Sequence, residues 1–248
     1  MSQTFVLITG ANRGLGRGLL ERFLAQPNHT VIAANRDPTH PTSKSLSELP
    51  KGQDSSLIVV RYDAAAEQDA SNVVDELKEK HGIDRLDIVI PNAGISKQHP
   101  LVKDAKRADM LEHVQVNVYA MISLYQATRD LLQKSTREPI FAPISSIAGS
   151  VTNQPPIQNA CYGASKCLLN WYGIRINAED EWLNTFVLDP GFSSTDMGIH
   201  AARTFGYPDE VLISPDDAVD GMFEVFQTAS KEEHGGRLVS YTGEIQEW

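Results

Sequence analysis

Tyr162 and Lys166 stand four residues apart in the stretch CYGASK, a spacing that places both side chains on one face of a helix. A free tyrosine has a pKa near ~10 and transfers protons poorly at neutral pH. An ammonium group nearby stabilises tyrosinate, so we expect Lys166 to lower the pKa of Tyr162. The pair alone is a weak signal, because tyrosine and lysine often share a solvated helix face. Its meaning depends on the residues that the fold brings to it.

Two cysteines flank this pair. Cys161 and Cys167 are six residues apart, so they do not share a helix face. They lack the spacing of a metal site and a paired histidine motif. We therefore predict that both cysteines pack inside the protein rather than form a redox or nucleophilic site. The seven histidines are scattered through the chain, and the sequence predicts no metal site.

A pair of serines, Ser145 and Ser146, follows the apolar run Ile140–Ile144, which has the length of a buried strand. Ligands of open α/β sheets bind beyond the carboxyl ends of the strands. A hydroxyl in that place can hydrogen-bond a substrate carbonyl and stabilise the alkoxide that develops during its reduction. Position alone does not choose between the two serines, and a serine at a strand end can also simply cap a turn.

A glycine-rich turn, Thr9-Gly10-Ala11-Asn12-Arg13-Gly14-Leu15-Gly16, joins the first apolar run to a segment of helical period. Glycines permit a tight turn and a close approach of the backbone to a ligand. The N-terminus of the helix then offers free N–H groups and a positive dipole end to a pyrophosphate. Such a turn between the first strand and first helix of a parallel sheet is typical of dinucleotide-binding proteins.

The end of the second apolar run, Thr30–Asn35, indicates which dinucleotide binds. NAD-binding proteins usually carry a carboxylate at this strand end for the ribose 2′-hydroxyl, whereas a nearby arginine suits a 2′-phosphate. Asn35 occupies the expected acidic position, Arg36 follows it, and Arg13 in the glycine turn is a second cation. We therefore predict NADPH or NADP as the cofactor. The alternative is that Arg36 pairs with Asp37 on the surface.

Apolar runs of strand length alternate with longer segments of helical period along the chain. The predicted strands are Phe5–Thr9, Thr30–Asn35, Leu57–Tyr62, Leu86–Ile90, Ile140–Ile144, Thr185–Leu188 and Arg237–Tyr241. The predicted helices are Leu15–Gln26, Glu67–Lys80, Met110–Gln133, Ser165–Ala178 and one that begins at the cap signal Ser214-Pro215. Strands without polar alternation that are separated by helices predict a mostly parallel sheet covered on both faces.

The predicted fold class is therefore α/β, a doubly wound Rossmann fold. No repeat, linker or block of charge divides the chain, so we expect one domain over residues 1–248. Two segments have the composition of loops, Arg36–Asp54 and Phe192–Glu210. The second, at about residues 192–210, is long enough to form a lid over a substrate.

The composition excludes several classes of function. The 248 residues carry a formal net charge of −10, which offers no basic surface for nucleic acid or an anionic membrane. No apolar run approaches the roughly 18–20 residues of a membrane helix, and the first residues lack the features of a secretion signal. Two cysteines fit a reducing compartment. These features predict a cytoplasmic protein that acts on a small molecule.

Five motifs together resemble the short-chain dehydrogenase/reductase family over nearly the whole chain. They are the turn T-G-x-x-x-G-x-G, the turn Asn92-Ala93-Gly94, the run S-S-I-A-G-S, the Y-x-x-x-K pair and the P-G-x-x-x-T segment that ends at Thr195. Pro91 departs from the family's more usual asparagine before N-A-G. The resemblance implies a seven-stranded, mostly parallel sheet with helices on both faces.

The resemblance also assigns roles that spacing alone does not. In the family the second serine of the motif is catalytic, which selects Ser146 to act with Tyr162 and Lys166. Asn117, in VQVNVYA, would by itself be interpreted as a structural residue within a helix. Its context matches the family's fourth catalytic residue, which holds a water in a proton relay.

The cofactor site implied by the resemblance draws on several parts of the chain. Asp63 matches the residue that contacts the adenine, and Thr195 matches the one that hydrogen-bonds the carboxamide. Pro190 and Gly191 match a turn beside the nicotinamide. The full predicted cofactor set is Thr9, Gly10, Asn12, Arg13, Gly14, Leu15, Gly16, Asn35, Arg36, Asp63, Asn92, Ala93, Gly94, Tyr162, Lys166, Pro190, Gly191 and Thr195.

These motifs predict NADPH-dependent reduction of a ketone or aldehyde to an alcohol, with Tyr162 as general acid. The stretches APISSI, DPGFSSTDMG, ARTFG and Y-x-G-E-I-x-x-W resemble the fungal norsolorinic acid ketoreductase group within the family, close to the sniffer-type carbonyl reductases. That resemblance implies an aromatic or polyketide-type carbonyl and a role in secondary metabolism. The alternative is an NADP(H)-binding protein with a repurposed pocket, either an isomerase or cyclase or a regulatory sensor. The family also implies a homodimer or homotetramer, and Trp171 and Tyr172 are candidates for either core or interface.

Overall fold

The computed structural model describes residues 3–248, in which a parallel sheet forms the centre of the molecule. Every neighbouring pair of its six strands runs parallel, as the unbroken apolar runs predict. In spatial order the strands are β3 (Ser56–Arg61), β2 (His29–Asn35), β1 (Thr4–Thr9), β4 (Ile88–Ile90), β5 (Ile140–Phe141) and β6 (Asn184–Thr185).

A smaller sheet continues this one beyond Phe186. It consists of β7 (Val187–Asp189), the parallel β8 (Leu238–Ser240) and the antiparallel β9 (Ile245–Gln246). The Leu188 amide donates to the Pro143 carbonyl at 3.0 Å, and the Ser145 amide donates to the Leu188 carbonyl at 2.7 Å. Because these bonds extend the pairing past β5, β6 and β7 are two halves of one strand position. The sheet therefore has the seven parallel positions expected, with β9 added at its edge.

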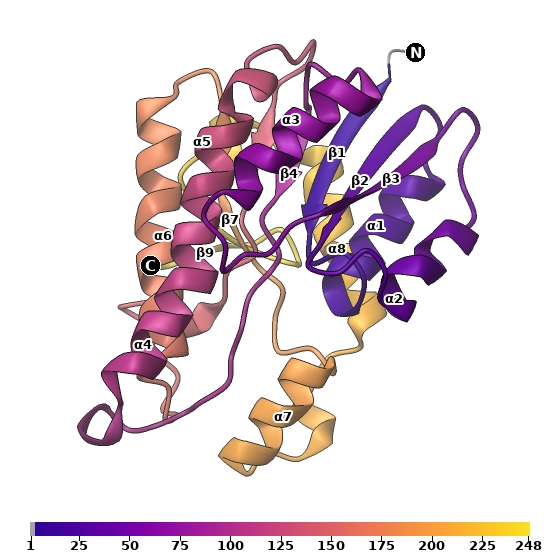
Figure 1. Ribbon diagram of the computed structural model, residues 1–248. Helices are drawn as coiled ribbons and strands as arrows, with labels where there is room; N and C mark the ends of the chain where they lie inside the picture. Colours follow the sequence, from indigo (N-terminus) through magenta and orange to yellow (C-terminus); the bar gives the residue numbers. More distant parts are fainter. Residues whose placement is uncertain (1–2) are drawn as a thin grey trace.

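Helices cover both faces of the sheet (Figure 1). One face carries α1 (Gly14–Ala25) and α8 (Pro215–Thr228), and the other carries α3 (Asp69–His81), α5 (Ala120–Leu132) and α6 (Tyr162–Glu179). Successive residues of β1 point to opposite faces, so Val6 and Ile8 join the first core and Leu7 joins the second. The fold class is therefore confirmed as a doubly wound α/β sheet.

Cap signals locate two helices, one expected and one not. The Ser214 side chain accepts a hydrogen bond from the Asp216 amide at 3.2 Å and begins α8, as predicted. The expected lid loop is instead largely helical, because it contains α7 (Asp196–Phe205). Thr195 is the N-cap of this helix, and Gly206, whose φ is +72°, is its C-cap. In Figure 1 α7 lies beyond the carboxyl ends of the strands, apart from the two helical layers.

Three further helical segments correct the expectations. The segment Arg36–Asp54 contains the short helix α2 (Pro41–Lys44) and a 3₁₀ turn rather than loop alone, and α9 (Lys231–His234) precedes β8. The predicted helix Met110–Gln133 is divided into α4 (Arg107–Val114), a π-helical turn over Gln115–Tyr119, and α5. Apolar periodicity does not reveal such a division, because a π turn adds one residue without ending the helix. Turns of this kind occur frequently at functional sites.

Candidate active site

Tyr162 begins α6, and Lys166 lies one turn later at the carboxyl end of β5. Lys166 is 6% exposed, and its Nζ donates to the Ile144 carbonyl at 2.7 Å. The same nitrogen lies 5.7 Å from the centre of the Tyr162 ring. The helix spacing therefore brings the pair together as predicted, with the ammonium bonded to a strand end and facing the tyrosine ring.

The structure distinguishes the two serines. Ser145 is buried and its hydroxyl donates to the Asn170 side chain on α6. Ser146 instead accepts from the Ala148 amide at 3.2 Å, and its hydroxyl lies close enough to the Tyr162 side chain to lower the pKa of that tyrosine. Ser146 is therefore the serine that meets the tyrosine, while Ser145 fastens the loop to the helix.

Burial dominates the proton affinities of the pair. It raises the pKa of Tyr162 to about 12, against the opposing effect of the Ser146 hydrogen bond, and the negative charge of Asp189 raises it further. Burial also lowers the pKa of Lys166 to about 8. The pKa of Tyr162 is therefore raised rather than lowered in this structure, because the loss of hydration on burial is the largest influence on it. Tyr162 is therefore protonated at neutral pH and can serve as an acid.

Asn117 lies in the π-helical turn and is 2% exposed. Its Oδ1 accepts from the Ile95 amide at 2.8 Å, and its Nδ2 donates to the Ile95 carbonyl at 3.0 Å and to Ser165 Oγ at 2.9 Å. A Cβ added to Gly94 would lie 3.2 Å from Asn117 Oδ1 and 3.9 Å from Lys166 Nζ. The structure thus brings Asn117 next to the tyrosine–lysine pair. Its bonds to Ile95 and Ser165 have no signal in the sequence.

The glycine turn is locked to the turn that follows β4. Thr9 Oγ1 accepts from the amides of Asn92 and Ala93 at 3.0 and 2.9 Å. Asn92 Nδ2 donates to the carbonyls of Thr9 and Gly10 at 2.9 and 3.2 Å. Gly10 has a φ of +64°, which favours glycine. A Cβ at Gly16 would lie 2.4 Å from Asn92 Nδ2, so the close approach requires glycine there as well.

The beginning of α1 suits an anion. Arg13 is the N-cap residue, and its side chain makes no capping hydrogen bond, so the first N–H groups of the helix are left for a ligand. Among the residues that the structure describes, a Cβ at Gly14 would meet only Thr195 Cγ2, at 3.8 Å. An open glycine turn below a helix N-terminus is the arrangement that binds the pyrophosphate of a dinucleotide.

The end of β2 presents Arg36 but not Asn35. Arg36 is exposed and makes no hydrogen bond or ion pair with any residue of 3–248, so the alternative pairing with Asp37 is absent from that range. Asp37 instead accepts from the amide and hydroxyl of Thr39 at 2.8 and 2.7 Å. The Asn35 side chain is fully buried, and neither of its polar atoms has a partner among those residues. The Asn35 amide is therefore not exposed in this structure, and its place in the cofactor set stays a prediction.

Asn12, Arg13 and Asp63 are also predicted to contact the cofactor, and they follow β1 and β3 at the carboxyl edge of the sheet. Asn12 Nδ2 donates to Thr42 Oγ1 of α2 at 2.6 Å, a contact that the sequence does not reveal. Arg13 Nη1 lies 3.9 Å from Asp196 Oδ2, and both side chains are mostly exposed. Asp63, after β3, accepts from the Ala65 amide at 3.0 Å.

The turn after β7 leads into a segment that faces the loop after β4. Gly191 has a φ of +70°, and Thr195 Oγ1 accepts from the Gly198 amide at 3.3 Å as the cap of α7. The Phe205 ring of α7 meets the His99 ring edge-on at 4.9 Å between centres. Tyr207 lies 6.4 Å from the ring centres of both Phe205 and Phe192. Aromatic side chains therefore join the segment 192–210 to the opposite wall.

The cysteines and the candidate metal ligands lie outside this group of residues. Cys161 is 1% exposed, and Cys167 is half-buried. Within residues 3–248, no three His, Cys, Asp or Glu side chains are grouped as metal ligands would be. None of the helices in that range is both long and apolar enough to cross a membrane.

Comparison with known proteins agrees with this geometry. The short chain dehydrogenase family matches residues 4–203. The norsolorinic acid ketoreductase of Dothistroma septosporum is 37% identical over 96% of this chain and 89% of its own. The enzyme of the same name from Aspergillus parasiticus is 35% identical over 97% of this chain and 89% of its own. The crystal structure of NADPH-bound carbonyl reductase from chicken fatty liver superposes with a TM-score of 0.87 at 26% identity, over the whole of both chains.

The match over most of the chain, together with a tyrosine, lysine and serine at the end of β5 and a glycine turn at the end of β1, establishes that this protein belongs to the short-chain dehydrogenase family of oxidoreductases.

Proposed function

We propose that this chain is an NADPH-dependent ketoreductase that converts a ketone or aldehyde into an alcohol. The observation that carries the proposal is the meeting of Ser146, Tyr162 and Lys166 at the carboxyl end of β5 in a chain of this family. A protonated tyrosine beside a serine hydroxyl can bind and protonate a carbonyl oxygen. This is the chemistry that a reductase requires.

NADPH is the proposed cofactor, and the related chicken carbonyl reductase is NADPH-bound. The uncapped start of α1 suits its pyrophosphate, and the exposed Arg36 suits a 2′-phosphate, with Arg13 as a second cation. The turns that begin at Asn92 and at Pro190 would flank the nicotinamide end. Bound NADPH supplies the hydride that the carbonyl carbon accepts.

The chain's own residues then act on the carbonyl oxygen. Ser146 donates a hydrogen bond that stabilises the developing alkoxide. Tyr162, whose pKa is raised, remains protonated at neutral pH and delivers the proton. The ammonium of Lys166 favours the tyrosinate that is left and binds the nicotinamide ribose. Asn117 holds the loop at Ile95 and positions the water through which the tyrosine recovers its proton.

An aromatic or polyketide-type carbonyl is the proposed substrate. Two relatives of 35–37% identity are named norsolorinic acid ketoreductases. The rings of Phe192, Phe205 and Tyr207 are in contact along the segment after β7, and Phe205 also meets His99 of the loop after β4. Flat aromatic compounds can stack against such rings.

A Tyr162→Phe variant tests the proposal. Wild type should oxidise NADPH in the presence of some members of a panel of aryl ketones and aldehydes. The variant should still bind NADPH and turn over at least about 100-fold more slowly, because the proton donor is missing. If wild type binds NADPH but no carbonyl compound causes its oxidation, the protein is a binding protein or an enzyme of another class.

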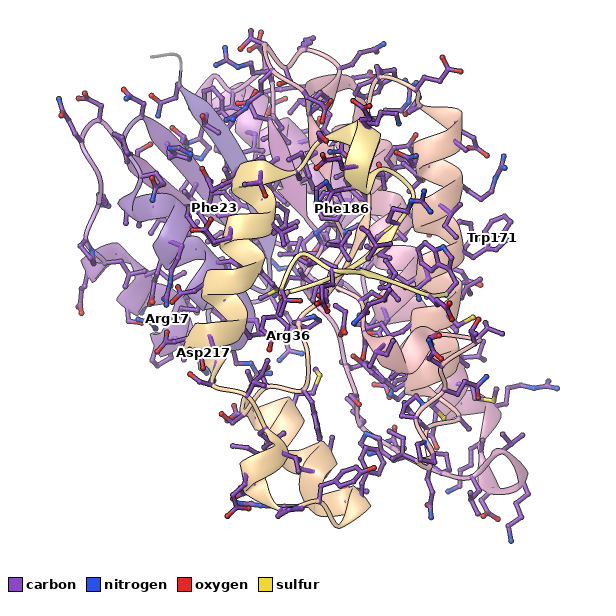
Figure 2. All side chains as sticks on the ribbon, turned by 180° about the vertical axis from the view of Figure 1, so that it is seen from behind. Arg17, Phe23, Arg36, Trp171, Phe186 and Asp217 are labelled. Atoms are coloured by element: carbon purple, nitrogen blue, oxygen red, sulfur yellow. The ribbon has the colours of Figure 1, made fainter. Side chains whose placement is uncertain are left out.

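The outer face of α6 supports a homo-oligomer as a further part of the proposal. Trp171 is 54% exposed and stacks edge-on with Tyr172 at 5.1 Å. Figure 2 shows Trp171 projecting from α6 away from the body of the protein. Light scattering of wild type and of Trp171→Glu should give a dimer or tetramer and a monomer, respectively. A wild-type monomer would contradict this part.

A further inference from the structure

The loop after β4 (residues 91–101) begins with the N-A-G turn and contains no helix or strand. In the part of the chain that the structure describes, residues 94–99 make no hydrogen bond to another backbone group. Backbone N–H and C=O groups that leave water need other partners, so side chains must supply them here. The conformation of this loop therefore depends on a few side-chain contacts.

Two side chains from one neighbouring helix bond to alternate residues of the loop. Asn117 Oδ1 accepts from the Ile95 amide at 2.8 Å, and Asn117 Nδ2 donates to the Ile95 carbonyl at 3.0 Å. His113, near the end of α4, accepts from the Lys97 amide through Nε2 at 3.2 Å. The loop is thus held at two points, one by the predicted catalytic asparagine and one by a histidine that precedes it by four residues.

The hydrogen bonds of His113 define the state of its ring, which is fully buried. Nδ1 lies 2.7 Å from the Asp109 carbonyl oxygen, which can only accept, so Nδ1 carries the hydrogen. Nε2 accepts from the Lys97 amide and therefore carries none. A neutral ring with hydrogen on Nδ1 satisfies both bonds. The helix itself thus fixes the ring and aims its lone pair at the loop.

Lys97 has a second tie to the same helix, at the surface. Its ammonium group pairs with the carboxylate of Glu112, and these side chains are 50% and 42% exposed. Exposed ion pairs of this kind contribute little, because water competes for both charges. The buried bond from the Lys97 amide to His113 is accordingly the contact expected to fix the loop.

The two ends of the loop are held by different parts of the protein. At the start, Thr9 Oγ1 accepts from two amides of the N-A-G turn at 3.0 and 2.9 Å. Toward the end, the His99 ring meets the Phe205 ring of α7 at 4.9 Å between centres. Lys97 lies between these contacts. Loss of the His113 bond should therefore loosen the later residues and leave the N-A-G turn in place.

We propose that His113 is a positioning residue of the candidate active site, which fixes residues 95–99 through the Lys97 amide while Thr9 fixes the N-A-G turn. The inference rests on the proposed function, since it assigns residues 95–99 to the carbonyl substrate and the N-A-G turn to NADPH. The loop passes the catalytic groups at Gly94, where an added Cβ would lie 3.9 Å from Lys166 Nζ. His113 acts on the reaction only through the loop.

Two substitutions of His113 separate its two hydrogen bonds. The amide of glutamine reaches about as far as Nε2, so His113→Gln can still accept from Lys97. The amide of asparagine reaches only about as far as Nδ1, so His113→Asn can keep the bond to Asp109 but loses the one to Lys97. Glu112→Gln is the matched control, because it removes the exposed ion pair with the same lysine.

Hydrogen–deuterium exchange of the Lys97 amide, followed by NMR, measures the bond without turnover. Exchange should be about tenfold faster in His113→Asn and within about twofold of wild type in His113→Gln and Glu112→Gln. Wild-type exchange in His113→Asn overturns the proposal. Equally fast exchange in all three variants does so as well, because the rate would then follow general destabilisation of the loop.

The ring of His113 can also be observed in wild type, which keeps the proposal testable if His113→Asn fails to fold. Proton–nitrogen spectra of protein labelled with ¹⁵N-histidine report which ring nitrogen carries the hydrogen, and the His113 signal is the one that is missing in His113→Gln. Hydrogen on Nδ1 is expected. Hydrogen on Nε2 would leave no acceptor for the Lys97 amide and overturns the proposal.

Steady-state kinetics and cofactor titration then test the role in the reaction. The KM for an aryl ketone that wild type reduces should rise about threefold to tenfold in His113→Asn and return to within about twofold in His113→Gln. The Kd of NADPH should stay within about twofold of wild type in both. An equal loss of NADPH affinity in His113→Asn overturns the separate holding of the two ends. If wild type reduces no carbonyl compound, the proposed function and the role in substrate binding fail together, and the exchange and ring measurements still decide the bond to Lys97.

Discussion

Gly16 and Gly18 lie on the same helix, but a methyl group added to each would press on a different part of the protein. A Cβ at Gly16 would lie 2.4 Å from Asn92 Nδ2 and 2.5 Å from the Gly10 carbonyl oxygen. A Cβ at Gly18 would lie 2.6 Å from Cγ2 of Val219 on α8. Ordinary contacts of a Cβ begin at 3.4 Å, so either alanine forces a shift of roughly 1 Å. The two substitutions are matched in size and crowding and differ in what must move.

Overpacking costs about 1–3 kcal/mol, and alanine recovers about 1 kcal/mol of helix propensity. At Gly16 the obstacle includes a backbone carbonyl, and Asn92 also bonds to the carbonyls of Thr9 and Gly10. The glycine turn itself must therefore deform. We expect Gly16→Ala to weaken NADPH binding by about tenfold or more, which corresponds to about 1.4 kcal/mol. Gly18→Ala should lower the free energy of unfolding by up to about 2 kcal/mol and change NADPH affinity by less than about twofold.

Fluorescence titration with NADPH measures the affinities, and urea unfolding measures the free energies of unfolding. Loss of affinity in Gly16→Ala alone supports the assignment of the glycine turn as the cofactor cradle. Equal losses in the two variants would show that the affinity follows general stability. Wild-type affinity in Gly16→Ala would refute the reasoning from the close contact.

Three further predictions concern the catalytic groups and the choice of cofactor. Ser146→Ala should lower kcat for reduction by about 100-fold. Ser145→Ala removes only a hydrogen bond to α6 and should lower kcat by less than about tenfold. Equal losses of kcat in steady-state assays would contradict this distinction. Arg36→Asp should raise the Kd of NADPH at least about tenfold and leave that of NADH lower or unchanged, and equal effects on both cofactors would remove Arg36 from the 2′-phosphate site. Burial lowers the pKa of Lys166 to about 8, so above that pH the unfolded chain binds more protons than the folded one. The free energy of unfolding of wild type, relative to that of Lys166→Met, should therefore rise by about 2 kcal/mol from pH 7 to pH 10. Urea titrations at several pH values measure this difference. A constant difference between these two proteins would contradict the burial of the ammonium.

Patterns within one segment predicted the framework well. The run predicted over Phe5–Thr9 is β1 (Thr4–Thr9), and the helix predicted over Leu15–Gln26 is α1 (Gly14–Ala25). The cap at Ser214 marks the start of α8 correctly. These elements depend on apolar period and on caps, which are properties of neighbouring residues. The same local signals were insufficient for α7, because its cap Thr195 stands in a stretch rich in serine and glycine that also suits a loop.

The amino-acid sequence by itself determined the family, the parallel sheet, the glycine turn and the residues that could carry out reduction. Those features reside in residue types and spacings that are close together in the chain. Only the tertiary structure decided which serine meets Tyr162, that burial raises the tyrosine pKa, and that Asp189 and Gln246, 57 residues apart, share a hydrogen bond. The physical reason is that burial, and with it the strength of a charge, depends on which distant segments pack together.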